Sequence, residues 1–458
     1  MELGSLFDGI GGWPLSATKY GINPVWASEI ESFPIEVTKK HFPNMKHLGD
    51  ITAINGAEIE PVDIVCMGSP CFAAGTLVLT KRGFVAIENV KIGDKVMTHT
   101  NSWHTVTETM IHGARKLYKL QAQGTLETIV TPEHPYYIRR MTRVWNNEKR
   151  CNERTFSDPV WTKVKDIGHG DFIGYPIIQT EENPINITKE EAWLIGRYVA
   201  DGYIDDSQRK DRDTVQFNHK VILCIGKEKV EHFKKKVKEH HACYKEERTV
   251  IKAEIIDERL AGLCKLCSKH AENKEIPSFI LNLPVDVLRE FFNGYMSGDG
   301  CYKEKTEIYV ATTVSRKLIF GLQAIVHKIY RTPCKLYFCK RPPTCIIEGR
   351  KVNQRDTYTI AFKIFIPKQS HAVVIDDHIW MPVSSCTEYA DNIPVYNLTV
   401  DKDNSYTANG CVVHNCQDLS IAGKRKGLAG ARSGLFMDAV RIIREMREVT
   451  NGKYLTIS

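Results

Sequence analysis

The sequence lacks both a long hydrophobic run and a recognisable targeting segment. Residues 1–5 are neither basic nor strongly apolar, and no uninterrupted apolar stretch elsewhere is long enough to span a bilayer. The 14 cysteines are scattered irregularly, without the spacing of a disulfide framework. We therefore expect a cytoplasmic protein with free thiols and no membrane partner.

A second cysteine pair is also missing. Cys264 and Cys267, with His270 nearby, have the spacing of half a zinc site, but no matching pair follows at zinc-finger distance. The stretch around them has a helical pattern. A structural role is therefore favoured over zinc binding.

Neither sign of charge is scarce, and the excess of positive charge is small. The 458 residues carry a formal net charge of +7, with 42% hydrophobic and 26% charged residues, a composition typical of globular domains. The length exceeds what one hydrophobic core supports and predicts about two to four domains. The mild positive charge fits a phosphate-bearing partner, and it fits simple solubility equally well.

One interrupted motif organises the chain. Residues 68–70 (Gly-Ser-Pro) are followed by Cys71, and far downstream residues 414–416 (His-Asn-Cys) precede Gln-Asp-Leu-Ser. Removal of residues 71–415 would join the two parts into the continuous motif Gly-Ser-Pro-Cys-Gln. An Asn can attack its own backbone carbonyl, a preceding His can transfer protons, and thiols at both junctions allow acyl exchange through thioesters.

These junctions resemble those of inteins, which excise themselves by protein splicing. The resemblance implies an all-β hedgehog/intein fold and a reaction without a cofactor. Short strands separated by turns, such as residues 76–80, 83–87 and 95–98, fit that fold. The resemblance also implies two nucleophilic thiols, a Thr-x-x-His block, a penultimate His and a cyclising Asn. These catalytic residues are Cys71, Thr131, His134, His414, Asn415 and Cys416.

Three positions depart from the intein pattern. Many members carry Asp where this chain has Asn397 and His where it has Asn404, and both would assist proton transfer. Pro70 is unusual before the first nucleophile, because its fixed φ constrains the conformation that the first acyl shift needs. A hedgehog-like protein that only cleaves itself is the competing interpretation, and the Asn-Cys junction argues against it.

The flanks contain a glycine-rich loop and two downstream carboxylates. Residues 6–12 (Leu-Phe-Asp-Gly-Ile-Gly-Gly) follow a short apolar start, and Glu29 comes about twenty residues later, where an acid can bind ribose hydroxyls. Asp50 ends a third expected strand, and residues 62–67 have the pattern of a fourth, buried one. Glycines in such a loop permit a tight turn close to a nucleotide-like ligand.

Together the flanks resemble the C5-cytosine DNA methyltransferases. The resemblance implies a split, partial α/β Rossmann-like domain and S-adenosylmethionine as methyl donor. It also implies that the Cys416 thiolate attacks C6 of a flipped-out cytosine. Residues 432–436 resemble the start of the helix after that catalytic loop. The cofactor-binding residues implied are Phe7, Gly9, Gly11, Gly12, Glu29 and Asp50.

The flanks do not contain the second catalytic motif of that family, Glu-Asn-Val. Residues 88–90 match it in letters, but they lie inside the segment that splicing would remove. The sequence stops at Ser458, before an arginine-rich motif or a target-recognition region. We therefore expect a methyltransferase fragment that is inactive alone and buries its apolar helix at residues 437–446 incompletely.

The middle of the insert contains an internal repeat. Residues 193–202 and 291–300 each show an apolar helical pattern with small residues four apart, and each ends in Asp-Gly. Small residues let two helices approach closely, which would bring Asp201 and Asp299 together. Paired carboxylates bind Mg²⁺, and metal-assisted phosphodiester cleavage needs such a cluster.

The repeat resembles the LAGLIDADG homing endonucleases. The resemblance implies an α+β, pseudo-symmetric monomer that cuts double-stranded DNA. Asp201 and Asp299 would bind Mg²⁺, and Lys274 would lie near the scissile phosphate. Lysines 234–236 would track phosphates, and a solvated face is an equal alternative. Two further interpretations stay open: a helix pair with decayed catalysis, and a DNA-binding module that does not cut.

The expected organisation is multidomain and nested. Residues 1–70 and 416–458 form the methyltransferase host. Residues 71–185 and 373–415 form the splicing domain, which encloses the endonuclease at residues 186–372.

Overall fold

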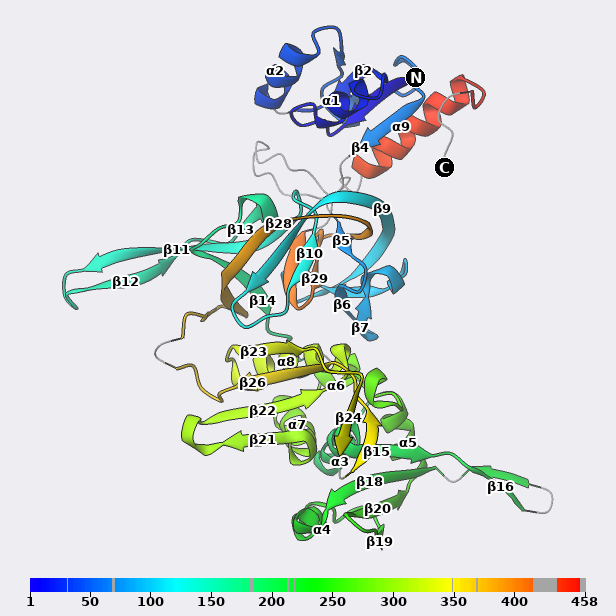
Figure 1. The fold of residues 1–458 in the computed structure, drawn as a ribbon, viewed down its shortest axis with the longest axis vertical. Coiled ribbons are helices and arrows are strands. Elements are labelled where there is room, and N and C mark those ends of the chain that lie inside the picture. Colours follow the sequence, from blue (N-terminus) through cyan, green and yellow to red (C-terminus); the bar gives the residue numbers. More distant parts are fainter. Residues whose placement is uncertain are drawn as a thin grey trace. The chain divides into compact units, whose positions relative to one another are not determined.

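The computed structural model describes residues 1–30, 32–67, 71–180, 185–211, 214–217, 219–347, 349–367, 370–414 and 435–453. The chain divides into two compact units, one made of Met1–Pro70 with Asn415–Ser458 and the other of Cys71–His414 (Figure 1). Within the described ranges, no helix is both long and apolar enough to cross a membrane.

The smaller unit is built on a parallel sheet. Its four strands lie in the order β3-β2-β1-β4, and every neighbouring pair is parallel. The strands are β1 (Glu2–Leu6), β2 (Asn23–Ser28), β3 (Lys46–His47) and β4 (Ile64–Met67). The helices are α1 (Gly12–Thr18), α2 (Ser32–His41), the short η1 (Ile51–Ala53) and α9 (Leu435–Val449).

Helix α9 packs against the smaller unit through the residues of its second half. Ile442 and Met446 are fully buried in one cluster with Trp26 of β2. The guanidinium of Arg441 donates a hydrogen bond to the carbonyl of Ile54 at 2.7 Å. The short η1 and the turn after it supply these contacts. Ile443 of the same helix is only partly buried, so incomplete burial of the helix as a whole stays an expectation.

The larger unit contains an extensive β-structure whose strands come from both ends of its sequence. The main path of this sheet is β12-β11-β14-β28-β5-β10-β9-β8-β6-β29-β30. Two long strands, β9 (Trp103–Ala122) and β28 (His378–Val400), pair along most of their length. This all-β architecture agrees with the expectation for the splicing segment.

The remaining elements of this sheet are short. They are β5 (Phe72–Ala73), β6 (Leu77–Thr80), β7 (Gly83–Ala86), η2 (Ile87–Asn89), β8 (Lys95–Met97), β10 (Thr128–Val130), β11 (Pro135–Asn146), β12 (Cys151–Phe156), β13 (Val160–Lys163), η3 (Val164–Asp166), β14 (Asp171–Pro176), β27 (Val373–Ile375), β29 (Ser405–Ala408) and β30 (Cys411–His414).

The hairpin of β29 and β30 turns through two residues. Asn409 and Gly410 have φ of 48° and 83°, the left-handed conformation that a two-residue hairpin turn requires. The antiparallel register then places Ser405 directly opposite His414. The turn at Asn409 and Gly410 therefore fixes where His414 lies on the sheet.

The remainder of the larger unit consists of two halves with the same topology. The halves open with α3 (Lys189–Asp201) and α7 (Val285–Asp299), and each continues into an antiparallel four-stranded sheet. In both sheets the strands lie in the spatial order first-second-fourth-third: β15-β18-β20-β19 and β21-β22-β26-β23. In both halves a helix, α4 or α8, separates the second strand from the third. This common order confirms the internal repeat.

The first half comprises β15 (Gly202–Asp205), β16 (Gln208–Asp211), β17 (Thr214–Phe217), β18 (Lys220–Gly226), η4 (Lys227–Lys229), α4 (Val230–Lys236), β19 (Ala242–Glu246), β20 (Val250–Ile256), α5 (Glu258–Lys265), η5 (Ala271–Asn273) and α6 (Ser278–Leu281). The second comprises β21 (Gly300–Lys303), η6 (Glu304–Thr306), β22 (Ile308–Thr313), α8 (Arg316–Tyr330), β23 (Cys334–Cys339), β24 (Thr344–Ile347), β25 (Arg350–Asn353) and β26 (Thr357–Phe362).

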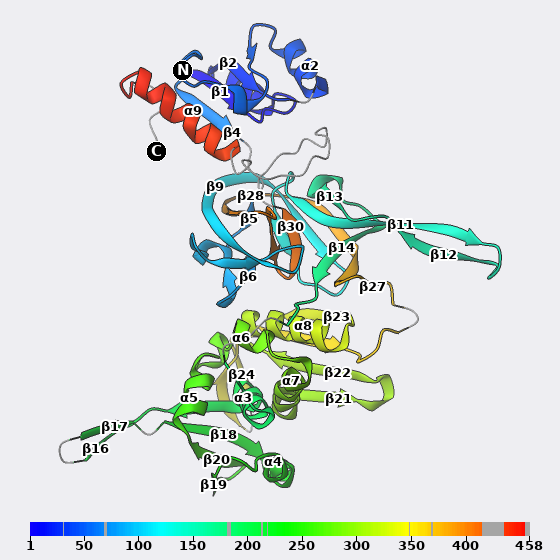
Figure 2. The ribbon, with the colours of Figure 1, turned by 180° about the vertical axis from the view of Figure 1, so that it is seen from behind.

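Helices α3 and α7 lie side by side with their backbones in close contact (Figure 2). A Cβ on Gly196 would overlap the carbonyl oxygen of Phe291, and a Cβ on Gly294 would overlap that of Trp193. Glycine is therefore required at both positions, as the small-residue spacing indicated. Because the helices run side by side and both end in Asp, their carboxylates come to the same end of the pair.

Candidate functional site

The backbone of Cys71 is held by one threonine. Its N–H donates to Thr131 Oγ1 at 2.7 Å, and its carbonyl oxygen accepts from the Thr131 N–H at 2.9 Å and from Thr131 Oγ1 at 3.2 Å. The pairing of β5 with β10 brings the two residues together, and Cys71 is fully buried. The N–H that Thr131 holds belongs to the peptide that splicing would break.

His134 closes the same turn. Its N–H donates to the carbonyl of Thr131 at 3.2 Å, and its fully buried ring lies 4.1 Å from that of Phe72, centroid to centroid. Phe72 follows Cys71 directly in the chain. The structure thus brings Cys71, Thr131 and His134 into one buried cluster.

The C-terminal junction is described only up to His414, which ends β30. Strand β30 pairs with β11 at Val413 and Tyr136, and His134 lies in the turn just before β11. The ring of His414 lies 4.7 Å from that of Trp161. Pro70, Asn415 and Cys416 lie outside the described residues, as do residues 432–434 of the expected methyltransferase helix start.

Asn397, one of the departures from the intein pattern, is fully buried in β28. Its Oδ1 accepts hydrogen bonds from the hydroxyl of Tyr406 at 2.7 Å and from the N–H of Leu398 at 2.8 Å. The Tyr406 ring packs 6.4 Å from that of His134. Asn397 therefore reaches the surroundings of His134 through Tyr406, a link that its position in the sequence does not reveal. Asn404 lies in the turn before β29, with φ of 52°.

Asp201 and Asp299 lie together at the ends of α3 and α7. A Cβ built on Gly298 would lie 2.9 Å from Asp201 Oδ2, which places the Asp201 carboxylate against the last turn of α7. Burial, and next the negative charge of Asp201, raise the pKa of Asp299 to about 7. The expected juxtaposition of the two acids is therefore present.

Arg197 was missed in the sequence as a partner of this site. Its Nη1 lies 2.9 Å from Asp201 Oδ2, and its Nη2 donates to the carbonyl of Cys224 at 2.6 Å. The side chain is buried, so the ion pair is shielded from solvent on one side. The spacing of four residues from Asp201, which puts both on one helix face, was the signal that could have identified it.

Lys274 is buried against the end of α3. Its Nζ donates to the carbonyls of Tyr198 and Gly202 at 2.8 and 3.2 Å, and lies 3.2 Å from the centroid of the Tyr198 ring. Burial lowers the pKa of Lys274 to about 8. Its carbonyl accepts from Ser315 Oγ, the N-cap of α8, at 2.6 Å. The residue is thus fixed from both sides, beside the strand that follows Asp201.

The donor set at these helix ends fits Mg²⁺. Among the described residues, no group of three or more His, Cys, Asp and Glu side chains surrounds a common point. Mg²⁺ is commonly held by one or two carboxylates together with water and substrate phosphates, so a pair of acids is sufficient. Burial, and next the negative charge of Asp201, raise the pKa of Asp299, and a bound cation would favour its charged form.

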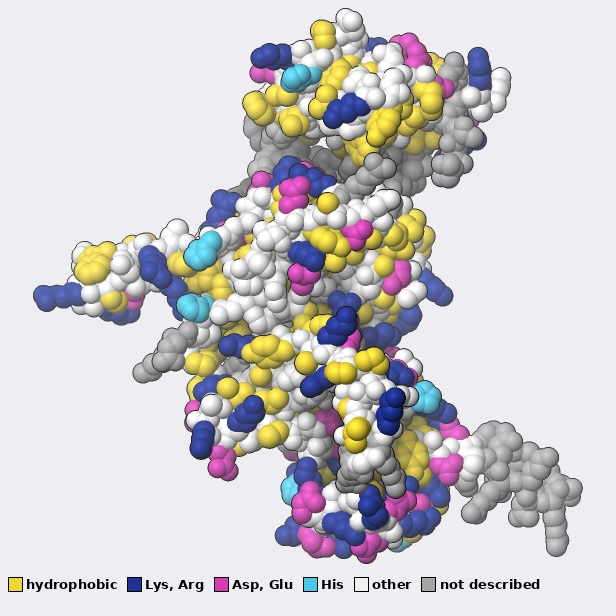
Figure 3. Space-filling model, in the orientation of Figure 1, with side chains coloured by type: hydrophobic (Ala, Val, Ile, Leu, Met, Phe, Trp, Pro, Cys, Tyr) yellow, Lys and Arg dark blue, Asp and Glu magenta, His cyan; other side chains and the backbone are white. Residues whose placement is uncertain are grey.

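The lysine run of α4 is paired with acids. Lys234 lies 3.0 Å from Glu231, and Lys236 lies 3.2 Å from Glu290. Figure 3 shows basic and acidic side chains interspersed over α4 and the neighbouring strands β19 and β20. The solvated-face alternative is therefore favoured for this run.

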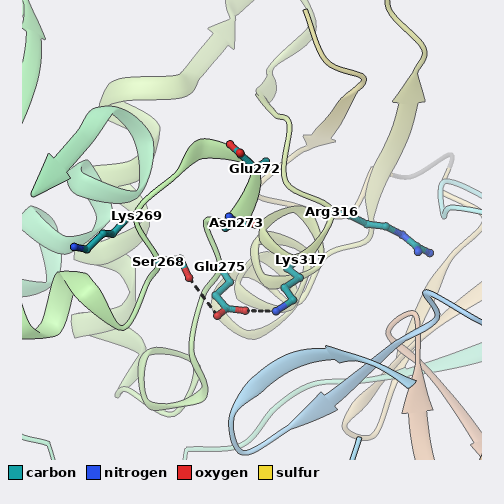
Figure 4. A pocket seen from close by; sticks show the side chains of 7 residues that line it. All are labelled: Ser268, Lys269, Glu272, Asn273, Glu275, Arg316 and Lys317. Carbon is teal, nitrogen blue, oxygen red and sulfur yellow. Dashed lines mark hydrogen bonds and ion pairs between the residues drawn. The ribbon is translucent and has the colours of Figure 1, made fainter. Parts of the chain in front are cut away.

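An open cavity of about 590 Å³ lies beside the residues that flank Lys274 (Figure 4). Glu275 projects into it and is paired with Lys317 at 2.9 Å. Neither Asp201 nor Asp299 lines the cavity. The Lys274 ammonium turns away from it, toward the end of α3, so we assign the cavity no role in the chemistry of the acid pair.

Cys264, in α5, and Cys267, just after this helix, are fully buried in the hydrophobic core. Burial raises the pKa of Cys267 to about 12, so its thiol stays protonated at neutral pH. Both cysteines pack as small apolar groups in this core.

The glycine-rich loop of the smaller unit is turned by left-handed residues. Phe7, Gly9 and Gly11 have φ of 54°, 57° and 83°. Gly9 donates its N–H to Glu29 Oε2 at 2.9 Å, which ties the loop after β1 to the end of β2. Gly12 begins α1. These residues therefore form one connected loop at the carboxyl edge of the sheet.

Asp50 follows β3 at the same edge. The carbonyl of Gly49, just before it, accepts from Ser28 Oγ at 2.7 Å, so the ends of β2 and β3 are joined. The six positions expected to bind a cofactor thus follow β1, β2 and β3, where ligands of parallel sheets lie.

Two protein families match parts of the chain. Residues 1–74 and 415–449 match C-5 cytosine-specific DNA methylases, and residues 70–154 match the Hint domain. The two matches overlap only at residues 70–74.

Several curated proteins are similar over most of this chain. An iron–sulfur cluster assembly SufBD family protein of Mycobacterium tuberculosis is 25% identical over 76% of this chain and 43% of its own length. The ATP-dependent DNA helicase Hel308 of Thermococcus kodakarensis is 22% identical over 78% of this chain and 37% of its own length. The chain thus spans less than half the length of these relatives.

Solved structures give weaker likenesses. The homing endonuclease I-DmoI in complex with DNA and Mn is 10% identical and covers 38% of this chain and 90% of its own, with a TM-score of 0.26. A mini-intein variant of Ssp DnaB is 9% identical and covers 76% of this chain and 99% of its own, also with a TM-score of 0.26. These scores are too low to establish a shared fold. The family matches and the two-unit architecture together show that both ends of the chain carry regions of the C5-cytosine DNA methylase family, and that these regions flank a segment which opens with a Hint domain.

Proposed function

We propose that residues 71–415 excise themselves by protein splicing and join Pro70 to Cys416. The observation that carries this proposal is the clamp of Thr131 on both backbone groups of Cys71. This clamp lies where the methylase match gives way to the Hint match. Thr131 holds the backbone of Cys71, so the peptide bond before Cys71 is fixed for attack by the Cys71 side chain.

In the first step, the Cys71 sulfur would attack the carbonyl carbon of Pro70. A C–S bond forms, the C–N bond breaks, and the thiol proton passes to the Cys71 nitrogen. Thr131 Oγ1 already accepts the N–H of that nitrogen and keeps it oriented as it becomes an amine. His134 lies in the same turn, where it can move the proton between sulfur and nitrogen.

The remaining steps exchange and release the chain. The Cys416 thiol attacks the thioester and frees Cys71, which gives a branched chain. The side-chain nitrogen of Asn415 then attacks its own carbonyl carbon, and the peptide bond to Cys416 breaks. His414 carries a proton from the attacking nitrogen to the leaving one. The freed amine of Cys416 finally takes the acyl group from sulfur, so no external reactant is consumed.

The proposal is tested by weighing the products of the expressed chain. The wild type should yield the excised segment 71–415 and a ligated product of residues 1–70 and 416–458. Asn415→Ala should block release and leave precursor or branched chain. The exposed Asn147→Ala serves as a matched control that splices normally. Ligated product at the normal rate from Asn415→Ala would contradict the assignment.

A second activity is favoured by the paired acids. We propose that the region of about residues 186–372 is a Mg²⁺-dependent endonuclease for double-stranded DNA, enclosed by splicing-domain segments 71–185 and 373–415. Mg²⁺ would supply a Lewis acid that stabilises the charge of the reacting phosphodiester. Asp201 and Asp299 would hold the cation, and Lys274 would place a positive charge beside them. Cleavage that persists in EDTA would contradict the role of metal, and metal-independent binding without cleavage would support a DNA-binding module.

The host segments 1–70 and 416–458 fit part of a Rossmann-like domain that binds S-adenosylmethionine. The strand order β3-β2-β1-β4 and the loop from Phe7 to Gly12, held by Glu29, support this assignment. A ligated product made only of residues 1–70 and 416–458 carries no Glu-Asn-Val motif to stabilise the attacked cytosine, so we expect this product to transfer no methyl group. Methyl transfer to DNA from labelled S-adenosylmethionine by the purified ligated product would overturn this expectation.

A further inference from the structure

We propose that His99 is a positioning residue for His414 in the cleavage of the chain at Asn415. The inference rests on the splicing function proposed above and adds a residue to it. His99 lies between β8 and β9, more than three hundred residues before His414 in the chain. The sheet brings both histidines to one cluster.

His99 is anchored to the residue opposite His414. Its Nδ1 lies 2.8 Å from Ser405 Oγ, and its backbone N–H donates to the same oxygen at 3.1 Å. Ser405 and His414 face each other in the β29–β30 hairpin. Directly opposed residues share one face of a sheet, with Cβ atoms about 5 Å apart. The hydroxyl that His99 fixes is therefore a direct neighbour of the His414 side chain.

A tryptophan links the two rings a second time. The Trp161 ring lies 5.4 Å from that of His99 and 4.7 Å from that of His414, both in edge-to-face arrangements. Tyr137 packs 5.4 Å from His99 and 4.7 Å from Trp161, which fixes the indole from another side. Loss of the His99 ring would remove one wall of the space that orients His414.

His99 is itself held in place. Asp403 lies two residues before Ser405. It accepts hydrogen bonds from Thr98 and Thr100, the residues on either side of His99, and it lies 3.4 Å from His104. This network fixes the backbone that carries His99. Burial lowers the pKa of His99, so the ring is neutral at neutral pH and offers Ser405 one donor or one acceptor nitrogen.

The orientation of His414 matters because two proton transfers accompany the cleavage. The Asn415 side-chain nitrogen loses a proton as it bonds to its own carbonyl carbon, and the Cys416 nitrogen gains one as the peptide bond breaks. An imidazole serves both only when its nitrogens face that peptide. His99 does not take part in either transfer; it restricts the ring of His414 through Ser405 and Trp161.

The test uses the full chain with Cys71→Ala, which isolates release at the C-terminal junction. His99→Ala should slow release about tenfold, the effect of one buried hydrogen bond on an orienting side chain. His99→Asn, which keeps a polar atom near the position of Nδ1, should restore the rate to within about threefold of the parent. The exposed His169→Ala is the matched control and should release at the parental rate.

A separate readout distinguishes positioning from a general structural role. In full chains with Asn415→Ala, cleavage at Cys71 by dithiothreitol should be the same with and without His99→Ala. Ser405→Ala should slow C-terminal release as His99→Ala does, and the double variant should be no slower than either, because both act through one contact. Equal slowing of both junctions, or full additivity, would overturn the inference.

The outcomes also separate this inference from the function on which it rests. A Cys71→Ala parent that releases no C-terminal fragment would contradict the splicing function, and the inference with it. A parent that releases normally and is unaffected by His99→Ala would overturn the role of His99 alone.

Discussion

The larger unit contains two candidate sites built on opposite principles. The site around Cys71 sits on strands, is fully buried and is held by hydrogen bonds of Thr131 to the backbone. The site at Asp201 and Asp299 sits at helix ends, and burial has shifted the pKa of Asp299 up and that of Lys274 down.

The difference follows from where each substrate comes from. The proposed splice site would act on its own chain, so the fold would deliver the reacting peptide and no charge would be needed to recognise it. The acid site would act on a separate polyanion and a cation, and its charges stay incompletely compensated until those ligands arrive. We therefore expect that each site can be disabled by substitution without loss of the other.

The largest effect is expected from Asp299→Asn. DNA cleavage should fall on the order of a thousandfold or more, because charge stabilisation by a metal ion is worth several kcal/mol. Splicing should continue at the normal rate. The control is Asp286→Asn at the exposed start of the same helix, which should cut normally. Loss of splicing in a folded Asp299→Asn chain would break the separation of the two sites.

The corresponding substitution in the proposed splice site is Thr131→Val. It removes hydrogen bonds to the backbone of buried Cys71, each worth about 1–3 kcal/mol when its partner is left unsatisfied, so thioester formation should slow about tenfold to a hundredfold. Cleavage of Asn415→Ala chains by dithiothreitol measures this step. The exposed Thr142→Val is the control. DNA cleavage should not change, and an equal loss of both activities would show that the substitution acts on the fold.

Metal binding at Asp201 and Asp299 should also respond to pH, whereas the hydrogen bonds between Thr131 and the backbone of Cys71 involve no ionised group. Folding raises the pKa of the Asp299 carboxyl to about 7, so the proton is retained below that pH and competes with a cation. Mg²⁺ affinity should therefore fall about tenfold per pH unit below pH 7 and level off above it. Calorimetric titration of the full chain with Mg²⁺ checks this, and a flat profile from pH 5 to 8 would exclude Asp299 as a ligand.

The smallest effect is expected from Gly294→Ala. The added methyl would meet the Trp193 carbonyl, separate α3 from α7 and cost about 1–3 kcal/mol of stability. Gly262→Ala in α5 meets open space and should be neutral or stabilising by up to about 1 kcal/mol. Thermal unfolding of both variants gives the comparison. Equal midpoints would mean that the close helix contact does not hold the acids together.

Local patterns in the sequence were sufficient for several parts of this architecture. The repeated helices, which carry small residues four apart and end in Asp201 and Asp299, depend on residues close together in the chain. The two junction thiols were recognisable because they border an interrupted motif, although Cys416 lies outside the described residues.

The parts that could not be predicted depend on contacts between distant residues. The link from Asn397 through Tyr406 toward His134 crosses from β28 to β29 and on to the turn before β11. The turn of Lys274 toward α3 and the burial of α9 on η1 likewise arise only in the folded chain. Side-chain types and their spacing do not predict such contacts, because the prediction requires the register of the strands.

The most direct test of the account is the mass of the products that the purified full chain forms over time. We expect the precursor to disappear while the segment 71–415 and the ligated product of residues 1–70 and 416–458 accumulate in equal amounts, without added cofactor. Cys71→Ala should form no ligated product, and Asp299→Asn should form it at the wild-type rate. A wild-type chain that stays intact, or that yields unligated fragments only, would contradict the central claim.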